Sequence, residues 1–323
     1  MTPDARQREA LRRLTLTVAR RLHGLLHGEH LGLHAGPGSE PGDARLYQPG
    51  QDDVRTMDWA VTARTTHPHV RDLVADRELH TWTLLDLSAS MDFGTAHSQK
   101  RDLAVGVLAA VTLLTRGVGD HGGAHLLHRG RVVRWSARPG MSADQVVAGA
   151  LGRLWRAADP RPGEPPMRLA DAIADLSRTR RRHGLRVVVS DFLDTPLDSA
   201  PDWQTPLRRM SADCQTVAVE IVDPRELDLP AIGLVTMTDP ETGRTRQVHL
   251  TERVRQRYAR AAAEQRAAVA AALRSAGAAH LRLRTDRDWV RDIARFVVAQ
   301  RRTAHRLARH TVTRPTTRTR TAP

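Results

Sequence analysis

The chain has 323 residues, of which 40% are hydrophobic, and its formal net charge is +14. This length can bury one large core or two modest ones. The single cysteine, Cys214, excludes an internal disulfide framework and suits a reducing compartment. The N-terminus does not resemble a signal peptide, and the longest mostly apolar run, residues 103–114, is shorter than the roughly 20 residues that a membrane-spanning helix needs. We therefore expect a cytoplasmic protein that does not enter the membrane.

The first part of the chain, residues 1–79, is expected to hold one helix and an irregular segment. Apolar residues recur at helical spacing over residues 4–27, which predicts an amphipathic helix with an arginine-rich outer face. A Gly/Pro-rich loop and a charge-dense stretch follow. The charges could form an interaction surface or an ion-pair network that holds the segment on the next domain. Tyr47 and Trp59 within it favour packing.

Residues 80–300 alternate strand-like and helical patterns. The expected strands are residues 81–86, 125–127, 132–135, 185–190, 215–222, 234–237, 246–250 and 280–284. The expected helices are residues 100–116, 146–155, 169–178, 205–212, 251–276 and 288–302. This alternation predicts a mostly parallel sheet covered on both faces. We therefore expect a doubly wound α/β domain over residues 80–300, with the segment 1–79 packed on it.

The last stretch, residues 301–323, carries seven arginines and no carboxylate side chain. Its composition predicts a disordered basic tail. Nucleic acid could bind such a tail through counterion release. The tail has no aromatic residue on which bases could stack, and no nucleic-acid-binding motif is present. Nucleic-acid binding is therefore the alternative function, not the leading one.

Oxygen-bearing side chains follow two of the predicted strands. Asp86, Ser88 and Ser90 form an Asp-x-Ser-x-Ser sequence directly after one strand, and Asp191 follows another. In open α/β sheets the ligand lies outside the carboxyl ends of the strands. Mg²⁺ takes about six oxygen ligands and keeps several waters, so these side chains could form a Mg²⁺ site with a position open to a partner's carboxylate. The alternative is a helix N-cap at Ser90 or Asp92.

Two features of the sequence resemble a known family. Asp86, Ser88, Ser90 and Asp191 resemble the metal-ion-dependent adhesion site of von Willebrand factor A domains. The segment 45–64, which contains Arg-Leu-Tyr-Gln-Pro-Gly-Gln-Asp-Asp-Val-Arg, resembles the signature of the bacterial family called domain of unknown function 58 (DUF58), with Gln51 as one extra residue. The likeness continues at Glu78 and at residues 222–227 and 235–243.

This resemblance implies a role in protein binding. The family is similar to von Willebrand factor A proteins associated with MoxR-type AAA+ ATPases, which are thought to act as adaptors or chaperone-like partners. The resemblance therefore implies a non-enzymatic module that binds a MoxR-type ATPase through Mg²⁺. The family usually has Thr-Asp-Leu where this chain has Met167, Arg168 and Leu169. The loss of the threonine oxygen, and a positive charge near the cation, would weaken the metal site.

Other chemistries have weaker patterns. The only lysine is Lys100, and no phosphate-binding Gly-Lys-Ser/Thr sequence is present. No Gly-x-Ser-x-Gly sequence supports a hydrolase nucleophile, and a metal-dependent hydrolase has no evident general base. His121, His125 and His128 could bind a transition metal, but the expectation is that they are surface or edge-strand histidines.

Overall fold

A computed structural model describes residues 13, 17–18, 20–22, 44–48, 57–71, 80–96, 98–115, 121–157, 165–179, 184–193, 200–238 and 244–312. The chain divides into two compact units. We call Met1–Leu31 with Leu79–Ala299 the sheet unit, and Gly32–Glu78 with Gln300–Pro323 the small unit. The sheet unit contains the site predicted from the sequence.

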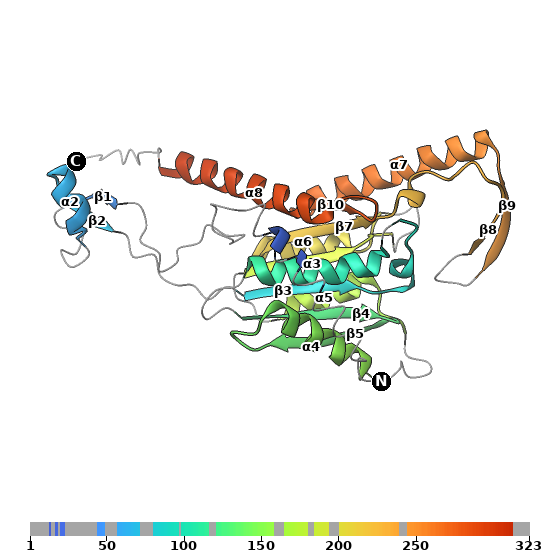
Figure 1. The fold of residues 1–323 in the computed structure, drawn as a ribbon, viewed down its shortest axis with the longest axis horizontal. Coiled ribbons are helices and arrows are strands. Elements are labelled where there is room, and N and C mark those ends of the chain that lie inside the picture. The colour runs from blue at the N-terminus through green and yellow to red at the C-terminus, as the bar shows by residue number, and fades with distance from the viewer. Residues whose placement is uncertain are drawn as a thin grey trace, which may run out of the picture. The chain divides into compact units, whose positions relative to one another are not determined.

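The sheet unit is built on six strands in the order β10-β7-β6-β3-β4-β5 (Figure 1). Their bounds are His80–Asp86 for β3, His121–His128 for β4, Arg131–Ala137 for β5, Gly184–Ser190 for β6, Gln215–Val222 for β7 and Ala279–Arg284 for β10. All neighbours are parallel except β4 and β5, which form an antiparallel hairpin. The predicted mostly parallel α/β sheet is confirmed.

Helices cover both faces of this sheet. Their bounds are Lys100–Leu114 for α3, Ala143–Trp155 for α4, Leu169–Arg178 for α5, Gln204–Asp213 for α6, Glu252–Ser275 for α7 and Trp289–Val312 for α8. Successive side chains of a strand point to opposite faces. Trp82 and Leu84 of β3 therefore lie in a core with α5 and α6, whereas Thr81 and Thr83 face α3 and α4.

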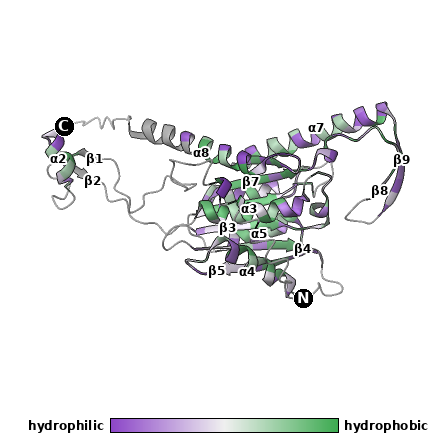
Figure 2. Cartoon of the chain, viewed as in Figure 1, coloured by the Kyte–Doolittle hydropathy of each residue, from purple (hydrophilic) through white to green (hydrophobic). Residues whose placement is uncertain are grey.

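Helix α3 is buried along most of its length, from Lys100 to Leu114. This agrees with its apolar sequence, which is green over most of the helix in Figure 2. Gly106 allows α8 to approach closely, because a Cβ atom there would lie 2.7 Å from the ring of Trp289. Helices α3 and α8, which are far apart in the sequence, therefore contact each other on this face.

Two further strands form a separate antiparallel ribbon. Strand β8 (Gly233–Thr238) pairs with β9 (Thr245–Leu250), as the sequence predicted. The short 3-10 helix η3 (Pro224–Glu226) connects the ribbon to β7, and α7 follows it. We call residues 230–250 the arm. In Figure 1 the arm projects at the right, beyond the edge of the six-stranded sheet.

Residues 44–48 and 57–71, the described part of the small unit's first segment, form a short ribbon and a helix. Strand β1 (Ala44–Leu46) pairs antiparallel with β2 (His69–Arg71). Helix α2 (Trp59–Thr65) begins after Asp58, whose carboxylate accepts hydrogen bonds from the amides of residues 60 and 61 at 3.0 and 3.1 Å. The side chain of Trp59 is 68% exposed. That this segment packs on the next domain, as Tyr47 and Trp59 favour, stays a prediction.

The two ends of the chain are described in part. Of the predicted helix at residues 4–27, the described residues are helical, and Val18 and Leu22 are buried; the others lie outside the described residues. Helix α8 continues to Val312, so the prediction of disorder from residue 301 is wrong for residues 301–312. Residues 313–323 lie outside the described residues. Within the described ranges, none of the helices is both long enough and apolar enough to span a membrane.

Candidate functional site

The carboxyl ends of β3 and β6 lie side by side and bring the predicted site residues together. The backbone N–H of Ser88 donates to Oδ1 of Asp86 at 3.0 Å, and the hydroxyl oxygens of Ser88 and Ser90 are 3.3 Å apart. The hydroxyl of Ser190, the last residue of β6, donates to Oδ2 of Asp86 at 2.7 Å. Asp86, Ser88 and Ser90 therefore converge, next to the strand end that carries Asp191.

The helix-cap alternative is not what the structure shows. Ser90 and Asp92 lie inside the 3-10 helix η2 (Ala89–Asp92), whose N-cap is Ser88 without a side-chain capping bond. The following helix, α3, is capped by Gln99. The two serine side chains are therefore not used as caps.

The carboxyl group of Asp86 is buried, with 3% of its surface exposed. Burial raises its pKa to about 6, and the nearby negative charge of Asp191 contributes in the same direction. Hydrogen bonds from Ser190 and Ser88 oppose these effects. A positive charge brought close to Asp86 would stabilise its ionised form and lower this pKa.

Asp191 already has a positive partner. Its Oδ2 accepts a hydrogen bond from Nζ of Lys100 at 2.7 Å, and its Oδ1 accepts one from the N–H of Leu193 at 3.1 Å. Nζ of Lys100 also bonds to Oε1 of Glu226 in η3. Burial alone would raise the pKa of Asp191, but Lys100 and the hydrogen bonds outweigh it and lower that pKa.

The turn after β6 holds Asp191 in place. Phe192 has a φ of 57°, in the left-handed region that costs a non-glycine residue about 1–3 kcal/mol. Its N–H donates to the hydroxyl of Ser190 at 3.0 Å, and its ring packs edge-on against Trp203 with the ring centroids 5.1 Å apart. This buried aromatic pair compensates for the backbone strain.

Further buried charges extend from this pair along the sheet edge. Arg266 of α7 donates to the backbone oxygen of Asp191 at 2.8 Å, to Glu226 at 2.9 Å and to Glu220 at 3.1 Å. Glu220 is fully buried in β7 and also accepts from Arg282 at 2.7 Å. His280 lies 2.8 Å from the same carboxylate. We call Lys100, Asp191, Glu220, Glu226, Arg266 and Arg282 the charge network.

Sequence reasoning missed most of the charge network. One signal was available, because Glu220 interrupts the apolar strand Thr-Val-Ala-Val-Glu-Ile-Val. A carboxylate in a strand that is buried on both faces requires a cationic partner. Arg266, among the alanines of α7, is the matching signal. The pairing itself could not be read from the sequence, because the two residues are 46 positions apart.

A second link at this edge is made by Asp223, directly after β7. Its carboxylate accepts from the N–H and hydroxyl of Thr95 at 2.9 and 2.5 Å, and from the hydroxyl of Thr285 at 2.7 Å. Burial opposes its ionisation, but these bonds lower its pKa. Asp223 therefore connects the loop after β3 with the ends of β7 and β10.

The residues present do not fit the predicted Mg²⁺ site. Both carboxylate oxygens of Asp191 accept hydrogen bonds, one of them from an ammonium group. At the position where the family has threonine and aspartate, Arg168 forms an ion pair with Asp202 at 2.8 Å. Mg²⁺ at Asp86, Ser88, Ser90 and Asp191 stays a prediction from the sequence.

The three histidines predicted at the surface or at an edge strand have different surroundings. His125 is 1% exposed on β4, a strand with neighbours on both sides, so the prediction is wrong for this residue. Its Nδ1 lies 3.1 Å from Oδ2 of Asp175. Burial lowers the pKa of His125 to about 4, although the charge of Asp175 opposes this. The ring of His121 stacks on His80, and His128 contacts the backbone oxygen of Leu87.

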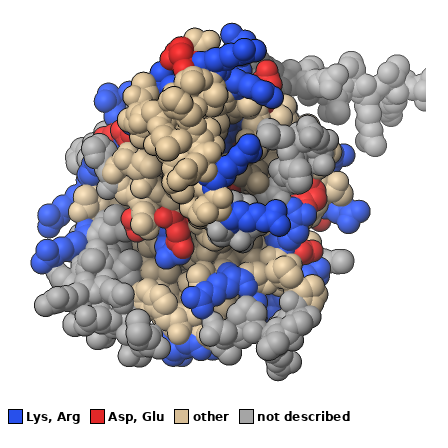
Figure 3. All heavy atoms as spheres, turned by 90° about the vertical axis from the view of Figure 1, so that its right-hand side faces the viewer, with Lys and Arg blue, Asp and Glu red and all other residues tan. Residues whose placement is uncertain are grey.

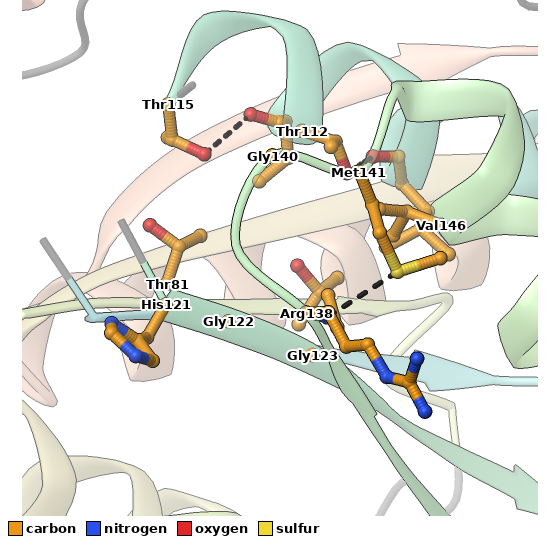
Figure 4. A pocket seen from close by; sticks show the side chains of 14 residues that line it. Thr81, Thr112, Thr115, His121, Gly122, Gly123, Arg138, Gly140, Met141 and Val146 are labelled. Carbon is orange, nitrogen blue, oxygen red and sulfur yellow. Dashed lines mark hydrogen bonds between the residues drawn. The ribbon is translucent and has the colours of Figure 1, made fainter. Parts of the chain in front are cut away.

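The opposite end of the sheet contains a small cavity of about 70 Å³ between α3, α4 and the strands (Figure 4). Thr81, Thr83, Thr112 and Thr115 are among the residues that line it. The hydroxyls of Thr112 and Thr115 donate to backbone oxygens of their own helix. The hydroxyl of Thr81 is buried without a hydrogen-bond partner. The cavity has room for a few water molecules.

The face from which the arm projects carries many positive side chains. Figure 3 shows Lys and Arg spread around a surface of uncharged residues on this side, with few Asp and Glu among them. This agrees with the net charge of +14.

This chain has relatives among known proteins. The sequence profile of the family described as "Protein of unknown function DUF58" matches residues 43–268. An uncharacterized protein of Mycobacterium tuberculosis is 49% identical over 301 residues, which cover 93% of this chain and 92% of that protein. An uncharacterized protein of Mycobacterium avium is 42% identical over 173 residues, which cover 54% of this chain and 97% of that protein.

Two solved structures are similar to this chain at 13% sequence identity. The conserved hypothetical protein BatB from Bacteroides thetaiotaomicron aligns with a TM-score of 0.40 over 69% of this chain and 99% of that chain. A von Willebrand factor type A protein from Catenulispora acidiphila aligns with a TM-score of 0.36 over 70% of this chain and 42% of that chain. Because the family profile matches residues 43–268, well over half of the chain, this chain belongs to the DUF58 family.

Proposed function

We propose that this chain is a non-enzymatic protein-binding module, an adaptor or chaperone-like partner of a MoxR-type AAA+ ATPase. The observation that carries the protein-binding role is the exposure of large apolar side chains at the carboxyl edge of the sheet. They are Phe93, Ile232, Leu234, Met237 and Val254, which are 36–65% exposed. Large exposed apolar patches are typical of interaction surfaces, and three of these five side chains lie on the arm, within residues 232–237. The identity of the ATPase rests on the family resemblance.

The arm supports this proposal because its two strands have little buried surface to stabilise them. A two-stranded ribbon is marginally stable in water. Along β8 and β9, only Leu250 at the base is buried, whereas Leu234 is 65% exposed. A partner that covers the arm would bury this apolar surface and stabilise the ribbon.

The charge of the arm suggests the chemistry of the partner surface. Arg246 and His249 on β9 and Arg253 at the start of α7 are exposed beside the apolar residues. A partner surface that combines acidic and apolar side chains would match both features, and the charge would speed the encounter at low salt.

The test is capture of the ATPase from the native cell by the tagged chain, in the presence of Mg²⁺ and ATP. Leu234→Glu is expected to reduce capture at least about tenfold, because it places a charge in the apolar contact. Thr236→Glu is the matched control, since it adds the same charge two residues along β8 at a side chain that is already polar and exposed. Equal capture by both variants would remove the arm from the interface. Failure of the unmodified chain to capture a MoxR-type ATPase would remove the pairing.

In an alternative form of the same function, a bound metal ion makes the contact with the partner. In it, Mg²⁺ at Asp86, Ser88, Ser90 and Asp191 would link to a carboxylate of the partner. The convergence of the first three side chains supports it, and the ion pair of Asp191 with Lys100 speaks against it. Capture that survives Asp86→Ala would exclude this version and leave the arm as the contact.

A further inference from the structure

Lys100 stands apart from the other basic residues of the chain. It is the only lysine among 50 lysine and arginine residues. Its side chain is 1% exposed, although lysine is almost never fully buried unless it is paired. All the other Lys/Arg positions of the chain hold arginine. The one lysine side chain is therefore buried, and it lies at the carboxyl edge of the sheet.

The contacts of Lys100 place this ammonium at the predicted metal site. Nζ bonds to Asp191 at 2.7 Å and to Glu226, and it lies 6.0 Å from the ring centroid of Phe93. Asp191 in turn follows Ser190, whose hydroxyl binds Asp86. The group that neutralises the carboxylates of this edge is therefore supplied by the chain.

The charges around Lys100 are balanced without a metal. The charge network contains three carboxylates, on Asp191, Glu220 and Glu226, and three cations, on Lys100, Arg266 and Arg282. Asp86 is the only further carboxylate in the site predicted from the sequence. A divalent ion would add two positive charges against this one carboxylate, and uncompensated charge in a buried site is costly.

We propose that the ammonium of Lys100 is the built-in cation of this edge, and that it takes the place of the divalent metal ion of related adhesion sites. It joins the end of β6, through Asp191, to η3, through Glu226, and η3 leads directly into the arm. The base of the arm is thus held on the sheet by a cation that is covalently part of the chain. An ammonium is a compact charge with three donors, whereas the guanidinium of arginine is larger and planar, so the two are not interchangeable.

The first test is a titration of the full chain with Mg²⁺ or Mn²⁺, followed by thermal unfolding. A ligand that binds only the folded state must raise the Tm. We expect no metal-dependent change for the unmodified chain. Lys100→Ala should lower the Tm without metal and regain part of it with Mg²⁺, because the substitution leaves carboxylates around a space of suitable size. Lys100→Met, which removes the charge but fills that space, is the matched control and should not respond to Mg²⁺.

Two results of this titration would overturn the proposal. One is a metal-dependent rise in Tm of the unmodified chain that Asp86→Ala abolishes, since it would show a working metal site beside the lysine. The other is a folded Lys100→Ala variant that does not respond to either metal, since removal of the ammonium would then not uncover a cation site.

A second test needs no variant and decides the matter if the substituted chains fail to fold. Because Lys100 is the only lysine, isotope-labelled lysine gives a single side-chain amine signal in NMR. We expect this amine to resist acylation in the folded chain and its signal to stay unchanged on addition of MgCl₂. Acylation as fast as that of a free lysine, or a shift of the signal with MgCl₂, would overturn the proposal. Both tests use the isolated chain, so their outcome does not depend on capture of an ATPase.

Discussion

Buried polar groups at the two ends of the parallel sheet find different kinds of partner. At the carboxyl end, the charge network pairs each carboxylate with a cation from another segment. At the amino end, the buried guanidinium of Arg186 donates to the backbone oxygens of His80 and Thr179 at 3.0 and 3.2 Å. Of the threonines that line the cavity in Figure 4, Thr112 and Thr115 donate to backbone oxygens of their own helix.

The hydroxyl bonds at the amino end are local, although the contact of Arg186 with His80 there joins residues 106 positions apart. The bonds of Thr112 and Thr115 join residues four positions apart, so the helix alone can form them. The contacts of Lys100 and Glu220 join residues 46 to 126 positions apart. Removal of one partner at the carboxyl end therefore leaves a buried charge that no local group can satisfy.

The largest expected effect tests this dependence at Glu220. Glu220→Met should lower the free energy of unfolding by about 3–5 kcal/mol, because Arg266 is left buried without one of its carboxylates. Chemical denaturation measures the change. Asp286→Ala is the control, since this carboxylate pairs with Arg284 at a partly exposed place and should cost less than about 1 kcal/mol.

The double variant Glu220→Met with Arg266→Met sharpens the same comparison. It removes both charges, so its cost should be smaller than the sum of the two single costs. Costs that simply add would show that the two side chains are not coupled, contrary to their 3.1 Å contact.

A smaller effect, dependent on pH, is expected at His125. Its pKa is lowered from 6.5 to about 4 by burial, so the unfolded chain binds more protons than the folded chain between these values. His125 therefore reduces stability as the pH falls from 6.5 to about 4, by up to about 3 kcal/mol. His125→Gln should remove this part of the pH dependence, as measured by the difference between the two chains across the window. Identical slopes would show that the histidine titrates normally.

The smallest effects compare one hydroxyl at each end. Ser190→Ala should cost about 1–3 kcal/mol, because Asp86 and the N–H of Phe192 both lose a partner. Thr81→Val should change stability by less than about 1 kcal/mol, in the stabilising direction, because it removes a buried hydroxyl without a partner. A costly Thr81→Val would mean that this hydroxyl binds a water in the cavity.

The fold could be predicted from the sequence because its elements have strong local patterns. Helix α5 and strand β7 begin and end where periodicity and apolar runs placed them. The convergence of Asp86, Ser88 and Ser90 followed from their position after a buried strand. The pairing of Lys100 with Asp191 could not be predicted in this way, because 91 positions separate them and only the folded sheet brings them together.

Two predictions failed because solvent exposure and helix ends depend on surroundings that a local pattern does not contain. His125 was expected at the surface or on an edge strand, yet it is buried on β4, between two other strands. The basic residues after position 300 were expected to be disordered, yet α8 continues through them to Val312. Arginine and alanine are good helix formers, so a basic composition alone does not end a helix.

The order of the strands has a consequence for synthesis on the ribosome. Glu220 is made before all three of its partners, Arg266, His280 and Arg282, which lie on α7 and on the last strand of the sheet. Domains generally fold as units during synthesis, in which the N-terminal part emerges first. A nascent chain that ends before α7 therefore has the central strands but an uncompensated carboxylate among them. We therefore expect the native pairing of Glu220 to form only after both α7 and β10 have left the ribosome.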